Sequence, residues 1–190
     1  KLLDWMTDAD IAPTDFLGGK VHACFLRALE NIWDDLTSAI AALQTSGQSV
    51  WITGHSLGAA LATLAAARFR LQLAKPVYGV YTYGSPRVGN TEFQMRFNQL
   101  CQLTTFRYVN NADAVTRVPL RETSYRHIGT FVYFNAKGTI ESDVHWWNQF
   151  VDSVTGDVEG FLTGKAAALN DHSMKNYVAR CKSTLPINPF

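Results

Sequence analysis

The chain has 190 residues, of which 47% are hydrophobic and 17% are charged, a composition typical of one folded domain with a substantial core. The formal net charge is +1 and the Lys and Arg residues are scattered, which gives no electrostatic basis for binding nucleic acid or an anionic membrane. Three cysteines exclude a disulfide scaffold, and no Cys-x-x-Cys or His-x-x-x-His spacing indicates a metal site. The longest uncharged apolar stretch, residues 57–67, is too short for a transmembrane segment.

The N-terminal quarter of the chain predicts two amphipathic segments. Residues 2–11 form a short one, which ends at Pro13 and the glycine pair that follows. A long helix comes next and stops at Ser46-Gly47. Its apolar face repeats at helical spacing through Phe25, Leu29, Ile32, Trp33, Leu36, Ile40 and Leu43.

Strand and helix patterns alternate through the rest of the chain. Apolar β-type runs predict strands over residues 50–53, 77–83 and 104–109, and an aromatic run predicts an edge or antiparallel strand over 127–134. Helices are expected over 57–74, from the capping residue Asn90 onward, over 144–154 and over 173–181. The alternation favours a parallel sheet covered by helices, in which ligands bind beyond the carboxyl ends of the strands.

The sequence Gly54-His55-Ser56-Leu57-Gly58 stands between the first of these strands and the Ala/Leu-rich helix. This is the G-x-S-x-G pattern in the context that a nucleophile elbow requires, strand, sharp turn and helix. The residues two before and two after the serine should be small, so that strand and helix can pack closely. Ser56 is therefore the candidate nucleophile, and the Leu57 N–H is the expected donor to an oxyanion.

A serine nucleophile needs a base, and in enzymes with this elbow the acid and then the histidine follow the serine in the chain. His22 precedes the serine, and the His55 side chain should leave the turn in another direction. His127 begins an aromatic run and is expected to be structural. His172, in a polar loop before the last helix, is the preferred base, and His145 is the alternative.

The preferred acid is Asp113, the first carboxylate after the strand over 104–109, in the loop at its carboxyl end. Asp171 adjoins the preferred histidine and is expected to solvate its loop or to cap the last helix. The other carboxylates weighed against it lie in helices or in the later helical excursion, namely Glu92, Asp143, Asp152 and Asp157.

With these residues the chain resembles the class 3 lipases, the fungal-type lipases of the α/β-hydrolase superfamily. The resemblance spans most of the chain and rests on Lys20-Val21-His22, Thr53–Gly58, Tyr83–Asn90, Arg107–Asn110 with Asp113, Val115 and Pro119, and His172 with Tyr177. It implies an α/β-hydrolase fold with a mostly parallel sheet flanked by helices. It also implies hydrolysis of acylglycerols or related esters without a cofactor, with Ser56, Asp113 and His172 as the triad.

The resemblance implies a lid and exposes two departures from the family pattern. The amphipathic residues 1–13 match the family's lid, or else a helix packed permanently on the core. Cys24 replaces a usual glycine. The family's strand ending in Arg-Gly-Ser/Thr, which gives the second oxyanion donor, would precede residue 1. We therefore expect residues 1–190 to be a single domain that lacks the N-terminal part of the sheet.

Ester hydrolysis of lipase type is the leading function, with a lipid or other ester as the partner molecule. Within the same class, a feruloyl-type or small-ester esterase is the alternative. Trp146-Trp147 would line an acyl groove or lie in the core. A different class is a non-catalytic lipase-like module for binding or signalling, which has no need for all three triad residues. The family resemblance makes secretion an expectation.

Overall fold

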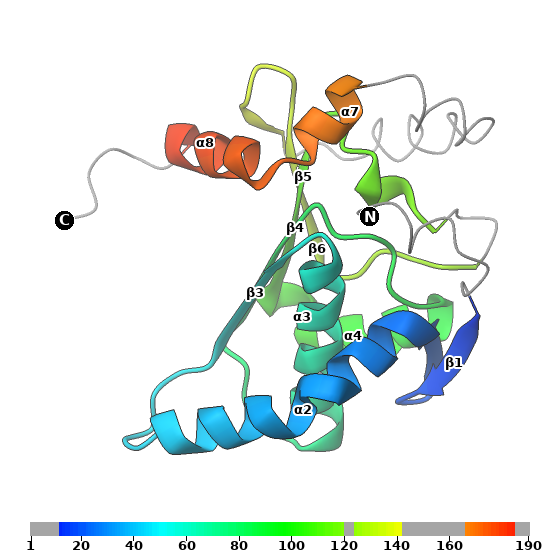
Figure 1. The fold of residues 1–190 in the computed structure, drawn as a ribbon, viewed down its shortest axis with the longest axis vertical. Helices are drawn as coiled ribbons and strands as arrows, with labels where there is room; N and C mark the ends of the chain where they lie inside the picture. Colours follow the sequence, from blue (N-terminus) through cyan, green and yellow to red (C-terminus); the bar gives the residue numbers. More distant parts are fainter. Residues whose placement is uncertain (1–11, 120–123, 142–165, 185–190) are drawn as a thin grey trace.

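The computed structural model describes residues 12–119, 124–141 and 166–184 (Figure 1). The strands are β1 (Pro13–Phe16), β2 (Gly19–His22), β3 (Trp51–His55), β4 (Gly79–Tyr83), β5 (Thr105–Asn110), β6 (Thr130–Phe134) and β7 (Ile140–Glu141). The helices are α2 (Ala23–Leu43), α3 (Leu57–Ala67), α4 (Thr91–Cys101), α7 (Ala166–Asp171) and α8 (Met174–Thr184). Short turns of π- or 3-10-helix are η1 (Arg68–Gln72), η2 (Gln102–Thr104) and η3 (Val115–Arg117).

The central sheet has the order β3-β4-β5-β6-β7. Strands β3 to β6 are parallel to one another, and only β7 is antiparallel to its neighbour. The mostly parallel sheet with flanking helices is confirmed. The strand expected over residues 127–134 is found over Thr130–Phe134, but it is not an edge strand, because β6 lies between β5 and β7. It runs parallel to β5 and antiparallel only to the two-residue strand β7. Aromatic residues alone do not report strand direction, which depends on the preceding crossover.

Helices α2, α3 and α4 lie together on one face of the sheet, as Figure 1 shows. Their apolar side chains form one core with β4, which includes Phe25, Leu29, Leu64, Val80, Phe93 and Phe97. Burying such a side chain contributes about 1.5–3 kcal/mol to folding. The apolar face expected along the whole of α2 is fully buried only at Phe25, Leu26 and Leu29. Trp33 and Ile40 are partly buried against the core, and Leu43 is 76% exposed.

Other elements differ from the sequence expectations. The β1–β2 hairpin and helix α7 were not predicted, and the helix expected over 57–74 changes to a π-helical turn after Ala67. The Asn90 cap is confirmed, since its side chain accepts a hydrogen bond from the Phe93 N–H. The helix expected over 144–154 lies outside the described residues, and so does the candidate lid over 1–13 apart from Ala12 and Pro13.

The carboxyl ends of the parallel strands meet the polar loops that the sequence singled out. Ser56 follows β3, Asp113 follows β5, and His172 lies between α7 and α8, which Figure 1 shows beside this end of the sheet. Within the described residues, no helix is both long and apolar enough to span a bilayer.

Candidate active site

Ser56 occupies a strained turn between β3 and α3. Its backbone has φ 59° and ψ −127°, a region that residues with side chains rarely adopt. The Ser56 N–H donates to the Tyr83 carbonyl at 3.0 Å, which fixes the turn against the end of β4. Ser56 is buried, with 5% of its surface exposed to solvent.

The close packing of strand and helix at this turn depends on one glycine. A Cβ atom at Gly54 would lie 2.1 Å from the Gly58 carbonyl oxygen, so no larger residue fits. A Cβ at Gly58 would meet no described atom within 4 Å. The expectation that both positions must be small is therefore right for Gly54, whereas at Gly58 no neighbour among the described residues restricts the side chain.

Leu57 is the first residue of α3. The first N–H groups of a helix have no intrahelical acceptor and lie at its positive end. The Leu57 N–H is therefore available, next to the serine, as a donor to negative charge that develops on a bound carbonyl oxygen.

Asp113 and His172 form a buried pair across 59 residues of sequence. His172 Nδ1 lies 3.0 Å from both Asp113 Oδ1 and Asp113 Oδ2. The side chains are 3% and 0% exposed. Asp113 Oδ1 also accepts from the Val115 N–H at 2.9 Å. A carboxylate at Nδ1 places the proton there and leaves Nε2 with its lone pair, the form that a general base requires.

The Asp113–His172 pair packs directly on the backbone of Gly84. This residue follows β4 with φ +57°, and a Cβ there would lie 2.7 Å from Asp113 Oδ2 and 2.8 Å from His172 Nδ1. Only a residue without a side chain lets the backbone come this close. Gly84 is thus part of the wall that holds the pair together.

Tyr177, in α8, bonds the other side of Asp113. Its hydroxyl donates to Asp113 Oδ2 at 2.6 Å and accepts from the Asn110 N–H at 3.0 Å. The side chain is fully buried. Burial, followed by the charge of Asp113, raises the pKa of Tyr177 well above its ordinary value, so the hydroxyl remains a donor.

His55, the residue before the serine, contacts the preferred base. Its Nε2–H donates to the His172 carbonyl at 2.7 Å, and the two rings stack with centroids 4.5 Å apart. Burial lowers the pKa of His55, although its bond to the His172 carbonyl acts in the opposite direction. His55 makes no hydrogen bond with the Ser56 hydroxyl, but it contacts His172, the residue that the sequence analysis chose as base.

The structure brings two of the three predicted triad residues into contact. Ser56 Oγ and His172 Nε2 are both buried, and neither has a hydrogen-bond partner among the described residues. The hydrogen bond between Ser56 and His172 is thus not made in this structure. His145, the alternative base, lies in the range 142–165, outside the described residues.

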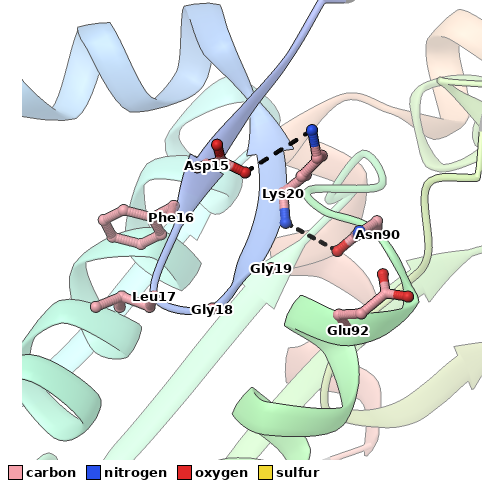
Figure 2. A pocket seen from close by; sticks show the side chains of 8 residues that line it. All are labelled: Asp15, Phe16, Leu17, Gly18, Gly19, Lys20, Asn90 and Glu92. Atoms are coloured by element: carbon pink, nitrogen blue, oxygen red, sulfur yellow. Dashed lines mark hydrogen bonds and ion pairs between the residues drawn. The ribbon is translucent and has the colours of Figure 1, made fainter.

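The pocket in Figure 2 lies elsewhere, between the β1–β2 hairpin and the start of α4. It has a volume of about 550 Å³ and includes none of the predicted triad residues in its lining. Its polar side chains are Lys20 and Asp15, which form an exposed ion pair at 3.8 Å, Glu92, and Asn90, whose side-chain oxygen already accepts from the Lys20 N–H at 2.9 Å. Over the described ranges, no cluster of three or more His, Cys, Asp or Glu side chains could hold a metal ion.

Comparison with known families decides where the chain belongs. The sequence model of the family described as "Lipase (class 3)" matches residues 1–123, about two thirds of the chain. The chain belongs to the class 3 lipase family. The matched region of this class 3 lipase includes Ser56 and Asp113, whereas His172 lies beyond it and is chosen on geometry and chain order.

Individual members of the class 3 lipases agree with this placement. The secreted mono- and diacylglycerol lipase 1 of Fusarium solani is 37% identical over 131 residues, covering 65% of this chain and 38% of that protein. A secreted mono- and diacylglycerol lipase of Malassezia restricta is 32% identical over 139 residues, covering 72% and 45%. The structure of lipase II from Rhizopus niveus superposes with a TM-score of 0.65 at 28% identity, covering 72% of this chain and 54% of that one.

The chain spans about half or less of the length of these class 3 lipases, 38%, 45% and 54% respectively. Within the part that is shared, the fold is the α/β-hydrolase fold of the family.

Sequence reasoning about this class 3 lipase missed four contacts of the site. None of Gly84, His55, Asp171 and Tyr177 was given a role in the site, although Gly84, His55 and Tyr177 are among the residues that carry the resemblance. The expectation that Asp171 solvates its loop or caps the last helix is wrong, because its Oδ2 accepts from the Asn111 side chain and the Ala112 N–H. A glycine directly after β4, at the strand end where the site lies, was the one available signal among the four.

Proposed function

We propose that this chain is a serine ester hydrolase of lipase type, which cleaves acylglycerols or related carboxylic esters through an acyl-enzyme. The observation that carries the proposal is the buried Asp113–His172 pair, with a lone-pair nitrogen left over at the same strand ends as the strained Ser56 turn. Relatives named as mono- and diacylglycerol lipases support acylglycerols as the substrate class.

In the proposed reaction, Ser56 Oγ attacks the ester carbonyl carbon while His172 Nε2 accepts its proton. Asp113 stabilises the imidazolium that forms, and the Leu57 N–H donates to the oxyanion. His172 then returns the proton to the leaving alcohol, which departs and leaves an acyl group on Ser56. A water molecule, deprotonated by His172, attacks the acyl carbon. The bond from that carbon to Ser56 Oγ then breaks, His172 returns the proton to Ser56 Oγ, and the carboxylic acid is released.

The test compares hydrolysis of p-nitrophenyl butyrate, p-nitrophenyl palmitate and a diacylglycerol by the chain and by Ser56→Ala. We expect Ser56→Ala to lose at least ~10³-fold in kcat, since the residual rate of such variants comes from binding and the oxyanion donors alone. The matched control is Ser49→Ala, an exposed serine in the loop before β3. Labelling with diethyl p-nitrophenyl phosphate, followed by mass spectrometry, should modify Ser56 in the wild type only.

Two other functions give different results in the same test. A feruloyl-type or small-ester esterase would cleave the butyrate and not the palmitate or the diacylglycerol. A non-catalytic lipase-like module would show equal background rates for the wild type and Ser56→Ala, and no labelling, which would overturn the proposal.

The proposal extends to the organisation and location of the chain. We propose that residues 1–190 form a single domain in which residues 1–13 act as a lid, and limited proteolysis with and without a detergent interface tests this. Relatives named as secreted lipases support secretion as a further proposal. The presence of the protein in culture medium rather than in cell extract is the test.

A further inference from the structure

We infer that Asp171 is a positioning residue, which ties the loop carrying Asp113 to the loop carrying His172 and so sets the geometry of the pair. The inference rests on the proposed function, in which His172 is the base and Asp113 its partner. It concerns a side chain that does not touch the reacting atoms.

Four consecutive residues each bind residue 171 or 172: Asn110, which ends β5, and the first three residues of the loop after it. The Asn110 side chain donates from Nδ2 to the Asp171 carbonyl at 2.9 Å. The Asn111 side chain donates from Nδ2 to Asp171 Oδ2 at 2.8 Å, and the Ala112 N–H donates to the same oxygen at 3.2 Å. Asp113 completes the series with its contact to His172 Nδ1 at 3.0 Å.

The conformation of the loop that carries Asp113 depends on the Asp171 carboxylate as a hydrogen-bond acceptor. Asn111 has φ 45°, a left-handed conformation that costs energy for a residue with a side chain. Its N–H donates to the Phe134 carbonyl at 2.8 Å, which ties the loop to the end of β6. The Asp171 carboxylate satisfies the two donors that this conformation turns toward α7, the Asn111 amide and the Ala112 N–H. Removing it leaves these donors unpaired directly beside Asp113.

The connection that carries His172 depends on the same contacts of Asp171. Residue 171 ends α7 and residue 174 begins α8, so His172 lies in a short connection between two helices. The contacts of Asp171 fix this connection to β5 one residue before His172, and His55 fixes the His172 carbonyl from the side of the serine. Displacing a reacting group by about 1 Å can cost ~10²-fold in rate. A loose connection would therefore lower kcat without changing how substrate binds.

Both side-chain contacts of Asp171 are made by Oδ2. A substitution can therefore remove the negative charge and still keep an acceptor oxygen, which tests the positioning role apart from the charge. An asparagine at 171 keeps an acceptor oxygen for the Asn111 amide and the Ala112 N–H, whereas an alanine removes it. We expect Asp171→Asn to keep kcat within ~3-fold of wild type and Asp171→Ala to lose ~10- to 100-fold, with KM unchanged in both. Asp35→Ala, at an exposed aspartate in α2, is the matched control.

A second variant tests the donor side of the hydrogen bond from Asn111 to Asp171. Asn111→Gly removes the side-chain amide at a position whose φ a glycine adopts without strain. We expect it to lower kcat, and the double variant with Asp171→Ala to be no worse than Asp171→Ala alone. Independent losses that multiply in the double variant would contradict a shared contact.

The deciding readout does not require activity. The proton between His172 Nδ1 and Asp113 gives a downfield ¹H NMR resonance, which reports the geometry of the pair in the resting protein. We expect this resonance in the wild type, Asp171→Asn and Asp35→Ala, and its loss or broadening in Asp171→Ala at temperatures where urea titration shows that variant to be folded. An unchanged resonance and kcat in Asp171→Ala would overturn the inference.

The outcome separates the two proposals. If Ser56→Ala hydrolyses esters as fast as the wild type, the proposed function fails, yet the resonance still tests whether Asp171 positions the pair. If Asp171→Ala loses activity only in proportion to its unfolded fraction, Asp171 is structural and the positioning role is wrong.

Discussion

The Tyr177 hydroxyl donates to Asp113 Oδ2 at 2.6 Å while accepting from the Asn110 N–H at 3.0 Å. One buried phenol therefore links helix α8 to the carboxylate of the proposed acid and to the end of β5. The bond is short because the acceptor is a charged oxygen away from water.

Tyr177→Phe removes this link and nearly nothing else. We expect it to lower the free energy of unfolding by about 1–3 kcal/mol, because the Asn110 N–H loses its acceptor and Asp113 loses a donor. We expect kcat to fall about 10-fold, since the carboxylate is less firmly held. Urea titration and p-nitrophenyl butyrate kinetics measure the two effects. Tyr78→Phe, at a tyrosine that is 54% exposed, serves as control and should change neither.

The sequence predicts those features of the site that depend on residues close together in the chain. The elbow and the loop after β5 were found because a strand end followed by a serine turn or an acidic loop is a local pattern. The pairing of Asp113 with His172 was inferred from chain order, and the structure brings them within 3.0 Å. Direction of β6 was missed, because strand direction is set by the crossover and not by the strand's own residues.

Contacts between distant loops could not be predicted. Asp171 and Asn111 are 60 residues apart, and a polar residue in a loop has by default its own turn or solvent as partner. His55 was judged by its neighbour in sequence, whereas its acceptor, the His172 carbonyl, lies 117 residues away. Such pairs become visible only when the sheet brings the loops to one edge.

His55→Phe separates the two contacts that His55 makes with His172. The phenyl ring keeps the stacking over the His172 ring but has no donor for the His172 carbonyl. We expect a loss of about 1 kcal/mol in stability and a fall of about 10-fold in kcat. His55→Ala loses the stacking as well and should be worse in both measurements. Equal kcat in wild type and His55→Phe would show that the hydrogen bond has no part in orienting His172.

Gly84→Ala should disrupt the proposed acid and base directly. The new Cβ would lie 2.7 Å from Asp113 Oδ2 and 2.8 Å from His172 Nδ1, so one of them must move. We expect a fall in kcat of ~10²-fold. Gly47→Ala is the matched control, because Gly47 also has positive φ, +75°, but its Cβ would meet no described atom within 4 Å. For Gly47→Ala we expect the free energy of unfolding to fall by only about 1–2 kcal/mol, the cost of a positive φ at alanine, with normal kcat. A normal kcat in Gly84→Ala as well would contradict the close packing.

The two glycines of the elbow should respond in opposite ways to alanine. Gly54→Ala places a Cβ 2.1 Å from the Gly58 carbonyl oxygen, and we expect little folded protein. Gly58→Ala meets no described atom outside its own helix within 4 Å, and in the first turn of α3 alanine is favoured over glycine by up to about 1 kcal/mol. Thermal unfolding and soluble yield measure both variants. A destabilised Gly58→Ala would mean that the pattern requires its second glycine for packing after all.

His127 should make the protein less stable in mild acid. Burial of its ring, and then the charges of Arg107 and Arg87, lower the pKa of His127 well below 6.5, while a bond to the Thr116 backbone opposes the shift. The unfolded chain therefore takes up a proton near pH 6.5 that the folded chain does not, so this contribution to stability is complete above that pH and is lost as the pH falls.

We expect the free energy of unfolding to decrease below pH 6.5 with a slope of up to about 1.4 kcal/mol per pH unit from this one group. Gln at this position keeps a donor for the Thr116 backbone but does not titrate. The urea midpoint of the wild type should thus fall relative to that of His127→Gln as the pH is lowered from about 7.5 to about 5, because only the wild type carries the penalty. Parallel curves would show that His127 takes up its proton equally well in the folded and unfolded states, against the direction that burial beside two arginines requires.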